Sequence, residues 1–139
     1  MIKLTKDNTA TPVAYSVNTG VTPVTVPLTL DGTGDPVSIE SVSTEPVYVW
    51  ANDDTGFIGT YTSISLTISG SDTGVTWLLS LDGSTNWASS INVSNIDVNS
   101  TYQTTRVYAK ASALNNGSVI TNNYVTANIL LAATENPIA

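Results

Sequence analysis

The feature that most constrains the fold of this chain is a two-residue alternation of apolar and polar side chains. It is plainest in two runs of apolar residues: Val24, Val26, Leu28 and Leu30, and then Ile64, Leu66 and Ile68. Successive side chains of a β-strand point to opposite faces, so such runs predict strands with one buried face. No segment of ten or more residues has the apolar spacing of an amphipathic helix.

Turn-forming residues separate the alternating runs at short intervals. Residues 31–36, 52–56, 70–74 and 82–85 are rich in Asp, Asn, Gly and Ser. Asn and Asp favour turns because their side chains bond to nearby backbone, and Gly adopts positive φ angles without a steric cost. Short strands joined by such turns predict an all-β fold, either a sandwich or a barrel.

The dipeptide Asn116-Gly117 predicts a hairpin near the end of the chain. A two-residue type I′ turn prefers this pair because both of its central residues have positive φ. The preceding strand, residues 104–113, carries Val and Ala on one face, and its other face carries Arg106, Tyr108 and Lys110. The return strand has these inward-facing residues: Val125, Ala127, Ile129 and Leu131. We therefore expect the two strands to be neighbours in one sheet.

The composition argues against several classes of function. Four basic residues stand against eleven acidic residues, which gives a net charge of −7. Four cations are too few to form a patch that neutralises phosphates. We therefore expect neither nucleic acid nor a membrane surface as a partner. The chain has no His and no Cys, and it therefore lacks the commonest general base, the commonest zinc ligands and every thiol nucleophile. We expect a protein that is not an enzyme and uses no cofactor.

The N-terminal sequence and the polar composition bear on the compartment and the surface. Residues 1–20 contain no apolar run of the 7–15 residues that a secretory signal needs. We therefore expect synthesis in a host cytoplasm without export through a cleavable signal. Thr and Ser together make up 38 of the 139 residues. Because they occupy the outward positions of the alternating strands, the exterior is expected to be rich in hydroxyl groups.

Residues 46–133 resemble an immunoglobulin-like or fibronectin type III sandwich. Three places carry the resemblance: Trp77, the run from Ile91 to Tyr102, and Arg106-Val107-Tyr108-Ala109. Trp77 stands where such domains have their buried core Trp, and Tyr102 stands where they have a tyrosine corner, whose hydroxyl bonds to upstream backbone. The third place is similar to strand F of a fibronectin type III domain.

The resemblance implies an immunoglobulin-like antiparallel β-sandwich over residues 45–139. Its expected core residues are Trp77, Tyr102, Ile64, Leu66, Leu79, Val107 and Ile129. Residues 1–44 are then an additional N-terminal β-strand segment. Three roles for this segment stay open: added strands of the same sandwich, strands exchanged with a neighbouring copy, or an arm that attaches the protein to an assembly.

A narrower resemblance is to immunoglobulin-like modules of tailed-bacteriophage virion proteins. Residues 47–56 resemble the strand and acidic-glycine turn with which those modules open, and residues 77–87 are similar to a hairpin of tail and capsid-surface proteins. The resemblance implies a structural protein located in the virion, either a capsid decoration or a tail component. Its implied partners are other virion proteins, host-surface glycans and further copies of itself.

The remaining candidate residues are aromatic or acidic. Trp50, Trp87 and Tyr48 are candidates for contact with a partner, because exposed aromatic rings stack on sugars and anchor protein interfaces. They also support an alternative function, a carbohydrate- or cell-surface-binding module; a prokaryotic surface-layer or pilus subunit is a further alternative. Asp53 and Asp54 form a weak calcium candidate, for which an ordinary turn is the competing interpretation.

Overall fold

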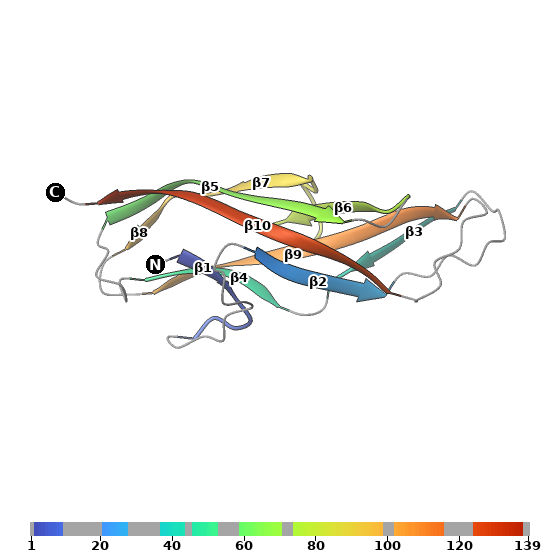
Figure 1. Ribbon diagram of the computed structural model, residues 1–139, viewed down its shortest axis with the longest axis horizontal. Helices are drawn as coiled ribbons and strands as arrows, with labels where there is room; N and C mark the ends of the chain where they lie inside the picture. The colour runs from blue at the N-terminus through green and yellow to red at the C-terminus, as the bar shows by residue number, and fades with distance from the viewer. Residues whose placement is uncertain are drawn as a thin grey trace.

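The computed structural model describes residues 2–9, 21–27, 37–43, 46–52, 59–70, 74–98, 102–115 and 124–137. All regular structure in these ranges is β-strand, and the strands form two antiparallel sheets that pack face to face. The protein is therefore a β-sandwich, with its strands running along the long axis of the molecule (Figure 1). No helix in these ranges has the length and apolar character needed to cross a membrane.

Within the described ranges, ten strands make up the two sheets. Their bounds are β1 (Ile2–Thr5), β2 (Val21–Pro27), β3 (Val37–Val42), β4 (Val47–Ala51), β5 (Gly59–Gly70), β6 (Thr76–Ser80), β7 (Ser90–Val93), β8 (Ile96–Val98), β9 (Gln103–Asn115) and β10 (Tyr124–Pro137).

The first sheet is organised around the long strand β9, and we call it the β9 sheet. On one side, β9 pairs with β4 and then with β3, while β6 pairs with its other side and β1 extends the sheet beyond β4. Ser43 joins the two partners on the shared side: its N–H donates to the carbonyl of Ala109 at 2.7 Å, and its hydroxyl accepts from the Ala109 N–H at 3.1 Å. β3, Ser43 and β4 therefore pair in succession along the same side of β9.

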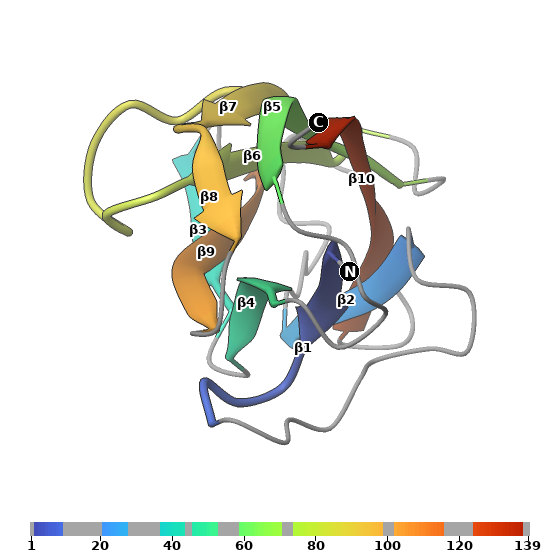
Figure 2. The ribbon, with the colours of Figure 1, turned by 90° about the vertical axis from the view of Figure 1, so that its left-hand side faces the viewer.

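The second sheet, which we call the β10 sheet, has the order β2–β10–β5–β7, and β8 pairs with the first residues of β5. Figure 2 looks along the sandwich and shows β10 and β2 on the side opposite β9 and β4. The edge strand β2 contains Pro23 and Pro27, which lack the N–H that a ladder needs. These two prolines, four residues apart, are tolerated because β2 is at the edge of the described sheet and pairs there with β10 alone.

A β-bulge in β5 reverses the alternation of that strand. The pairing with β10 shifts by one residue between Ala132 and Thr134, so that β5 contains one extra residue opposite them. Ser63, at the bulge, has a φ of 50°. Tyr61 and Ile64 consequently both point inward, although three residues apart, and both are completely buried.

Apolar side chains from both sheets fill the space between them. Six of the seven expected core residues are buried, at 0–5 % exposure: Trp77, Ile64, Leu66, Leu79, Val107 and Ile129. The seventh, Tyr102, is 36 % exposed. It precedes β9 and, at an even position, points to the outer face of the sheet, because the odd residues of β9 point into the core. The expectation of a buried tyrosine corner at Tyr102 is therefore wrong.

The last two strands lie in opposite sheets, which corrects the predicted hairpin. β9 pairs with β3, β4 and β6, whereas β10 pairs with β2 and β5. Asn116 and Gly117 themselves lie outside the described residues. The apolar faces of β9 and β10 meet across the core instead of lying side by side. Their alternating apolar residues are buried in this arrangement, as they would be in a hairpin. In an immunoglobulin domain the last two strands are neighbours in one sheet, so the strand order here differs from that arrangement.

The described strands of residues 1–44 are integral to both sheets. β1 pairs with β4, β3 pairs with β9, and β2 pairs with β10 over seven residues. Leu4, Val24 and Val26 are at most 4 % exposed and belong to the common core. The described strands of this segment therefore pair with strands of residues 45–139 within one sandwich.

Candidate functional site

The outer face of the β9 sheet gathers aromatic and cationic side chains. We call this set of residues the aromatic–cation face: Lys3, Tyr48, Trp50, Trp87, Tyr102, Arg106, Tyr108 and Lys110. Their placement follows from the strand period, because the core takes the odd residues of β9 and leaves the even ones outside. The strand pairing then brings aromatic and cationic residues together, because Tyr48 lies opposite Arg106 and Lys3 lies opposite Trp50.

Trp50 lies at one end of this face, beneath the first residues of the chain. Its indole N–H donates to the carbonyl of Thr9 at 2.9 Å, and Lys3 Nζ lies 4.7 Å from the ring centroid. Tyr102 stacks against it with ring centroids 6.0 Å apart and an interplanar angle of 16°. These neighbours leave Trp50 only 1 % exposed. Its assignment as a partner-binding residue is therefore wrong, because the chain itself occupies its surface.

Arg106 lies at the centre of the face, between two tyrosine rings. Its guanidinium carbon is 4.7 Å from the ring centroid of Tyr108 and 5.4 Å from that of Tyr48. Both distances are within the range of cation–π attraction. The Arg106 Nε is buried without a hydrogen-bond partner in the described part of the chain.

Lys110 and Trp87 form a third cation–aromatic pair, further along β9. Lys110 Nζ lies 4.5 Å from the ring centroid of Trp87 and 3.7 Å from Oε1 of Glu40. The Lys110 side chain is 14 % exposed, and that of Glu40 is 55 % exposed. Lys110 is thus paired with both an acid and a ring.

The loop after β6 folds over this face and is held by Ser80 and Asp82. The Ser80 hydroxyl, completely buried, accepts from the N–H groups of Asp82 and Gly83 at 3.2 Å each. Asp82 Oδ1 accepts from the N–H groups of Ser84 at 2.9 Å and Thr85 at 2.8 Å. The loop therefore has a defined shape, with Asp82 as its central acceptor.

Gly83 is the point of contact between this loop and the face. It has a φ of 76°, and a Cβ on it would lie 3.0–3.2 Å from three ring carbons of Tyr108. Its backbone therefore packs directly against the ring, which a larger residue would prevent.

Asp82 also accepts a hydrogen bond from the Thr85 hydroxyl at Oδ2, and the hydrogen bonds to its carboxylate shift its acidity. The Thr85 hydroxyl, followed by the N–H groups of Thr85 and Ser84, holds the pKa of Asp82 well below its usual value of 3.8. The carboxylate is thus the form that this loop stabilises, because it accepts several hydrogen bonds that a protonated acid cannot all accept.

We expect Asp82→Asn to lower stability in a pH-dependent way. A depressed pKa in the folded state adds stability above the unfolded-state value, near pH 4, and that stability is lost as the pH falls below it. The difference in melting temperature between the wild type and Asp82→Asn should therefore be full at pH 7 and shrink from pH 4 downward. Melting curves by circular dichroism from pH 7 to pH 2.5 measure it, and a difference that stays constant over this range contradicts it.

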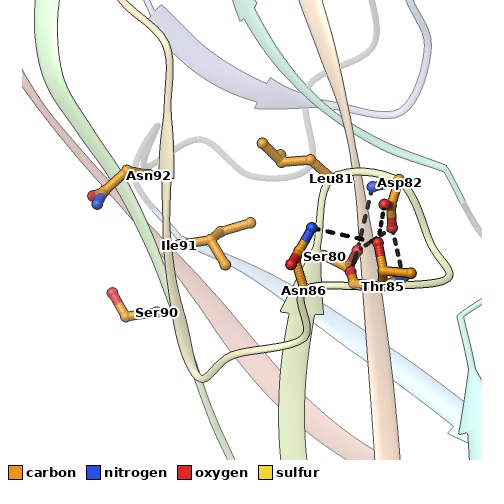
Figure 3. A pocket seen from close by; sticks show the side chains of 8 residues that line it. All are labelled: Ser80, Leu81, Asp82, Thr85, Asn86, Ser90, Ile91 and Asn92. Atoms are coloured by element: carbon orange, nitrogen blue, oxygen red, sulfur yellow. Dashed lines mark hydrogen bonds between the residues drawn. The ribbon is translucent and has the colours of Figure 1, made fainter.

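A pocket of about 290 Å³ lies beside the loop, between it and β7. Figure 3 shows the loop residues on one side and Ser90, Ile91 and Asn92 of β7 on the other. Hydroxyl, amide and carboxylate groups make up much of its lining, and Leu81 and Ile91 add apolar surface. The pocket thus combines hydrogen-bonding groups with apolar surface.

The predicted site residues thus have different outcomes. Tyr48 and Trp87 are half-buried on the aromatic–cation face, whereas Trp50 is covered. Asp53 and Asp54 lie outside the described residues. Sequence reasoning assigned no function to Arg106 and Tyr108, although their positions two apart on the outward face of a predicted strand were the signal that could have identified them.

Comparison with known proteins adds no relative: no family model, curated protein or solved structure matches this chain. Within the described ranges, no three acidic side chains gather closely enough to hold a metal ion.

Proposed function

We propose that this chain is a non-enzymatic structural protein of a virus particle, a capsid decoration or tail component. The proposal takes its class from the resemblance of residues 47–56 and 77–87 to virion modules. The observation that carries it is structural: the outer faces of the two sheets have different kinds of side chain.

The two outer faces have contrasting chemistry. The β10 sheet presents mainly hydroxyl and amide groups across its central part, together with the exposed side chain of Leu130. We call the polar residues of this part the hydroxyl face: Thr25, Ser65, Thr67, Ser69, Ser90, Asn92, Thr126 and Asn128. Neighbouring strands are linked on it by side chains, Thr25 to Thr126 at 2.9 Å and Thr67 to Ser90 at 3.2 Å. The aromatic–cation face, on the other sheet, has the residue types that dominate binding energy at protein interfaces, namely Tyr, Trp and Arg.

This contrast supports a module that attaches through one face and meets water with the other. The residues of the hydroxyl face carry no charge, and two pairs of its hydroxyl groups are bonded to each other. Aromatic rings held by cations present rigid apolar area at a low entropic cost, which favours a lasting contact. Attachment would thus occur through the β9 sheet, and residues 1–44 would contribute as strands of the sandwich and not as a separate arm.

The test is whether the protein is part of the particle. Virions purified from the source of this sequence on a density gradient should contain the chain at a fixed ratio to the major capsid or tail protein, as measured by mass spectrometry. Immunogold labelling should place it on the outside. A chain that is abundant in the infected cell and absent from purified particles overturns the proposal.

A matched pair of variants tests which face attaches. Particles lacking the protein are incubated with recombinant Tyr48→Ala, on the aromatic–cation face, or Thr67→Ala, on the hydroxyl face. Loss of one anchor at the centre of an interface weakens binding by about 10-fold or more. We expect that loss for Tyr48→Ala and none for Thr67→Ala. Equal binding by both variants contradicts attachment through the β9 sheet.

A second candidate function is the binding of a neutral sugar, and the pocket beside β7 is the observation that favours it. Asn86, Asn92 and Ser90 supply donors and acceptors, and Ile91 supplies apolar surface. A glycan array read by fluorescence tests it. Binding of a neutral glycan that Asn92→Ala abolishes supports this function, and no binding across the array removes it.

A further inference from the structure

We propose that Arg106, held between Tyr48 and Tyr108, is the point at which the aromatic–cation face binds a carboxylate side chain of a protein partner. This inference rests on the proposed function in taking the partner to be a protein of the particle. It adds the chemistry that the partner must present: an Asp or Glu on the surface that meets the β9 sheet.

Arg106 is a cation for which the described part of the chain supplies no anion. The ion pair recorded on this face joins Lys110 to Glu40, four residues further along β9. No carboxylate of the described residues pairs with Arg106, and its Nε–H is buried without an acceptor. A chain with eleven acidic residues and four basic ones would readily pair its only arginine. Since no acidic residue of the described ranges pairs with Arg106, its charge is available to another molecule.

The two tyrosines hold the guanidinium in one place before any partner arrives. Ring centroids at 4.7 and 5.4 Å attract the cation and restrict its rotamers. Tyr108 is itself held, because the backbone of Gly83 packs against its ring. An arginine ordered in advance loses less conformational entropy on binding than a free one.

The shape of the guanidinium selects the anion. With Nε covered by protein, the two terminal nitrogens are the donors that a partner can reach, and their planar fork matches the two oxygens of a carboxylate. An acceptor placed there would form charge-assisted hydrogen bonds partly shielded from water by the tyrosine rings. Such bonds are stronger than those between neutral groups.

The geometry favours a protein over an acidic sugar as the source of the carboxylate. On an aromatic surface such as this one, a sugar ring would bind by stacking on an uncovered face of a ring. Here Arg106 covers a face of both Tyr48 and Tyr108, Gly83 packs on Tyr108, and Lys110 lies over Trp87. The rings are therefore used to hold cations. Half-buried Tyr and Trp around a central Arg are typical of the anchors of protein interfaces.

The experiment measures binding at Arg106 directly, using the full chain and a pair of matched peptides. Because Arg106 is the only arginine in the sequence, its Nε–Hε group gives a single arginine signal in a ¹⁵N-labelled sample. The acidic probe is acetyl-GEGEGEG-amide at low salt, and the control peptide has Gln in place of each Glu. We expect a saturable shift of the Arg106 signal with the Glu peptide and none with the Gln peptide. An unmoved signal, or an equal shift with both peptides, overturns the proposal.

Variants separate the fork from simple charge. Arg106→Lys keeps the charge and loses the planar fork, so its apparent affinity for the Glu peptide, followed by backbone signals of β9, should fall about 10-fold. Lys110→Gln, on the same face of the same strand, should bind within about twofold of the wild type, because Lys110 already has an acid partner. Equal binding by Arg106→Lys, or a larger loss in Lys110→Gln than in Arg106→Lys, contradicts the proposal. Melting curves confirm that each variant is folded.

Two further arms identify the source and separate this inference from the proposed function. Glucuronate that saturates the Arg106 signal at lower concentration than the peptide overturns the choice of a protein partner. Particle binding that is unaffected by Arg106→Lys leaves the virion role intact and removes Arg106 as its contact. If the chain binds the Glu peptide but is absent from purified particles, the carboxylate contact at Arg106 is supported and the virion role is contradicted.

Discussion

A chain lacking residues 1–44 is expected not to fold into a cooperative domain. The deletion removes β1, β2 and β3, so that β4, β9 and β10 each lose a paired neighbour. It also removes Leu4, Val24 and Val26 from the core. Each buried aliphatic side chain contributes about 1.5–3 kcal/mol, so the three together approach the whole stability of a typical domain, about 5–15 kcal/mol. Circular dichroism and a two-dimensional NMR spectrum of residues 45–139 measure the outcome.

A pair of adjacent substitutions gives the same information without a deletion. Val26 is completely buried in β2, and Thr25 beside it is exposed. Val26→Asp places a charge in the core without a partner, which unfolds most domains. Thr25→Asp, on the other face of the same strand, should cost about 1 kcal/mol or less. A fragment 45–139 with a sharp melting transition, or a stable Val26→Asp variant, would show that residues 1–44 are separable from the sandwich.

Replacing Trp50 with alanine is expected to destabilise the protein by about 3–5 kcal/mol, the usual cost of removing a large aromatic side chain from a buried site. The substitution removes the hydrogen bond to the Thr9 carbonyl, the ring under Lys3 and the stacking partner of Tyr102. Residues 2–9 would lose their main attachment to the sheet beyond the β1–β4 ladder. Unfolding in urea followed by tryptophan fluorescence measures the loss.

Two variants serve as controls for Trp50. Trp50→Phe keeps most of the ring and removes the donor to Thr9, so its cost should be smaller, about 0.5–1.5 kcal/mol for the lost hydrogen bond. Trp87→Ala removes a half-exposed ring and should cost less than Trp50→Ala. If Trp50→Ala is as stable as the wild type, the covering of Trp50 by residues 2–9 does not hold in solution.

The candidate site was predictable only in part. The sequence makes Tyr48 and Trp87 candidates for contact with a partner, and the structure places both, half-buried, on the outer face of the β9 sheet. Trp50 was assigned to the same surface, yet it is covered, because the position of Thr9 and Lys3 above it depends on the pairing of β1 with β4. Arg106 was seen to face outward, but its place between Tyr48 and Tyr108 follows from the pairing of β4 with β9.

The sequence by itself determined that this protein is all-β, which strands it has in the clearest runs, and which side of each strand points inward. Ile64, Leu66, Leu79 and Val107 are buried as their alternation predicts. This information is local, since the two-residue period depends only on the geometry of one extended chain. The tertiary structure decided which strands are neighbours. β9 and β10 lie in opposite sheets, while β1 and β3 belong to one sheet and β2 to the other. Two strands with apolar faces can bury them as neighbours in one sheet or as members of opposite sheets. Only the packing of the whole chain selects between the two arrangements.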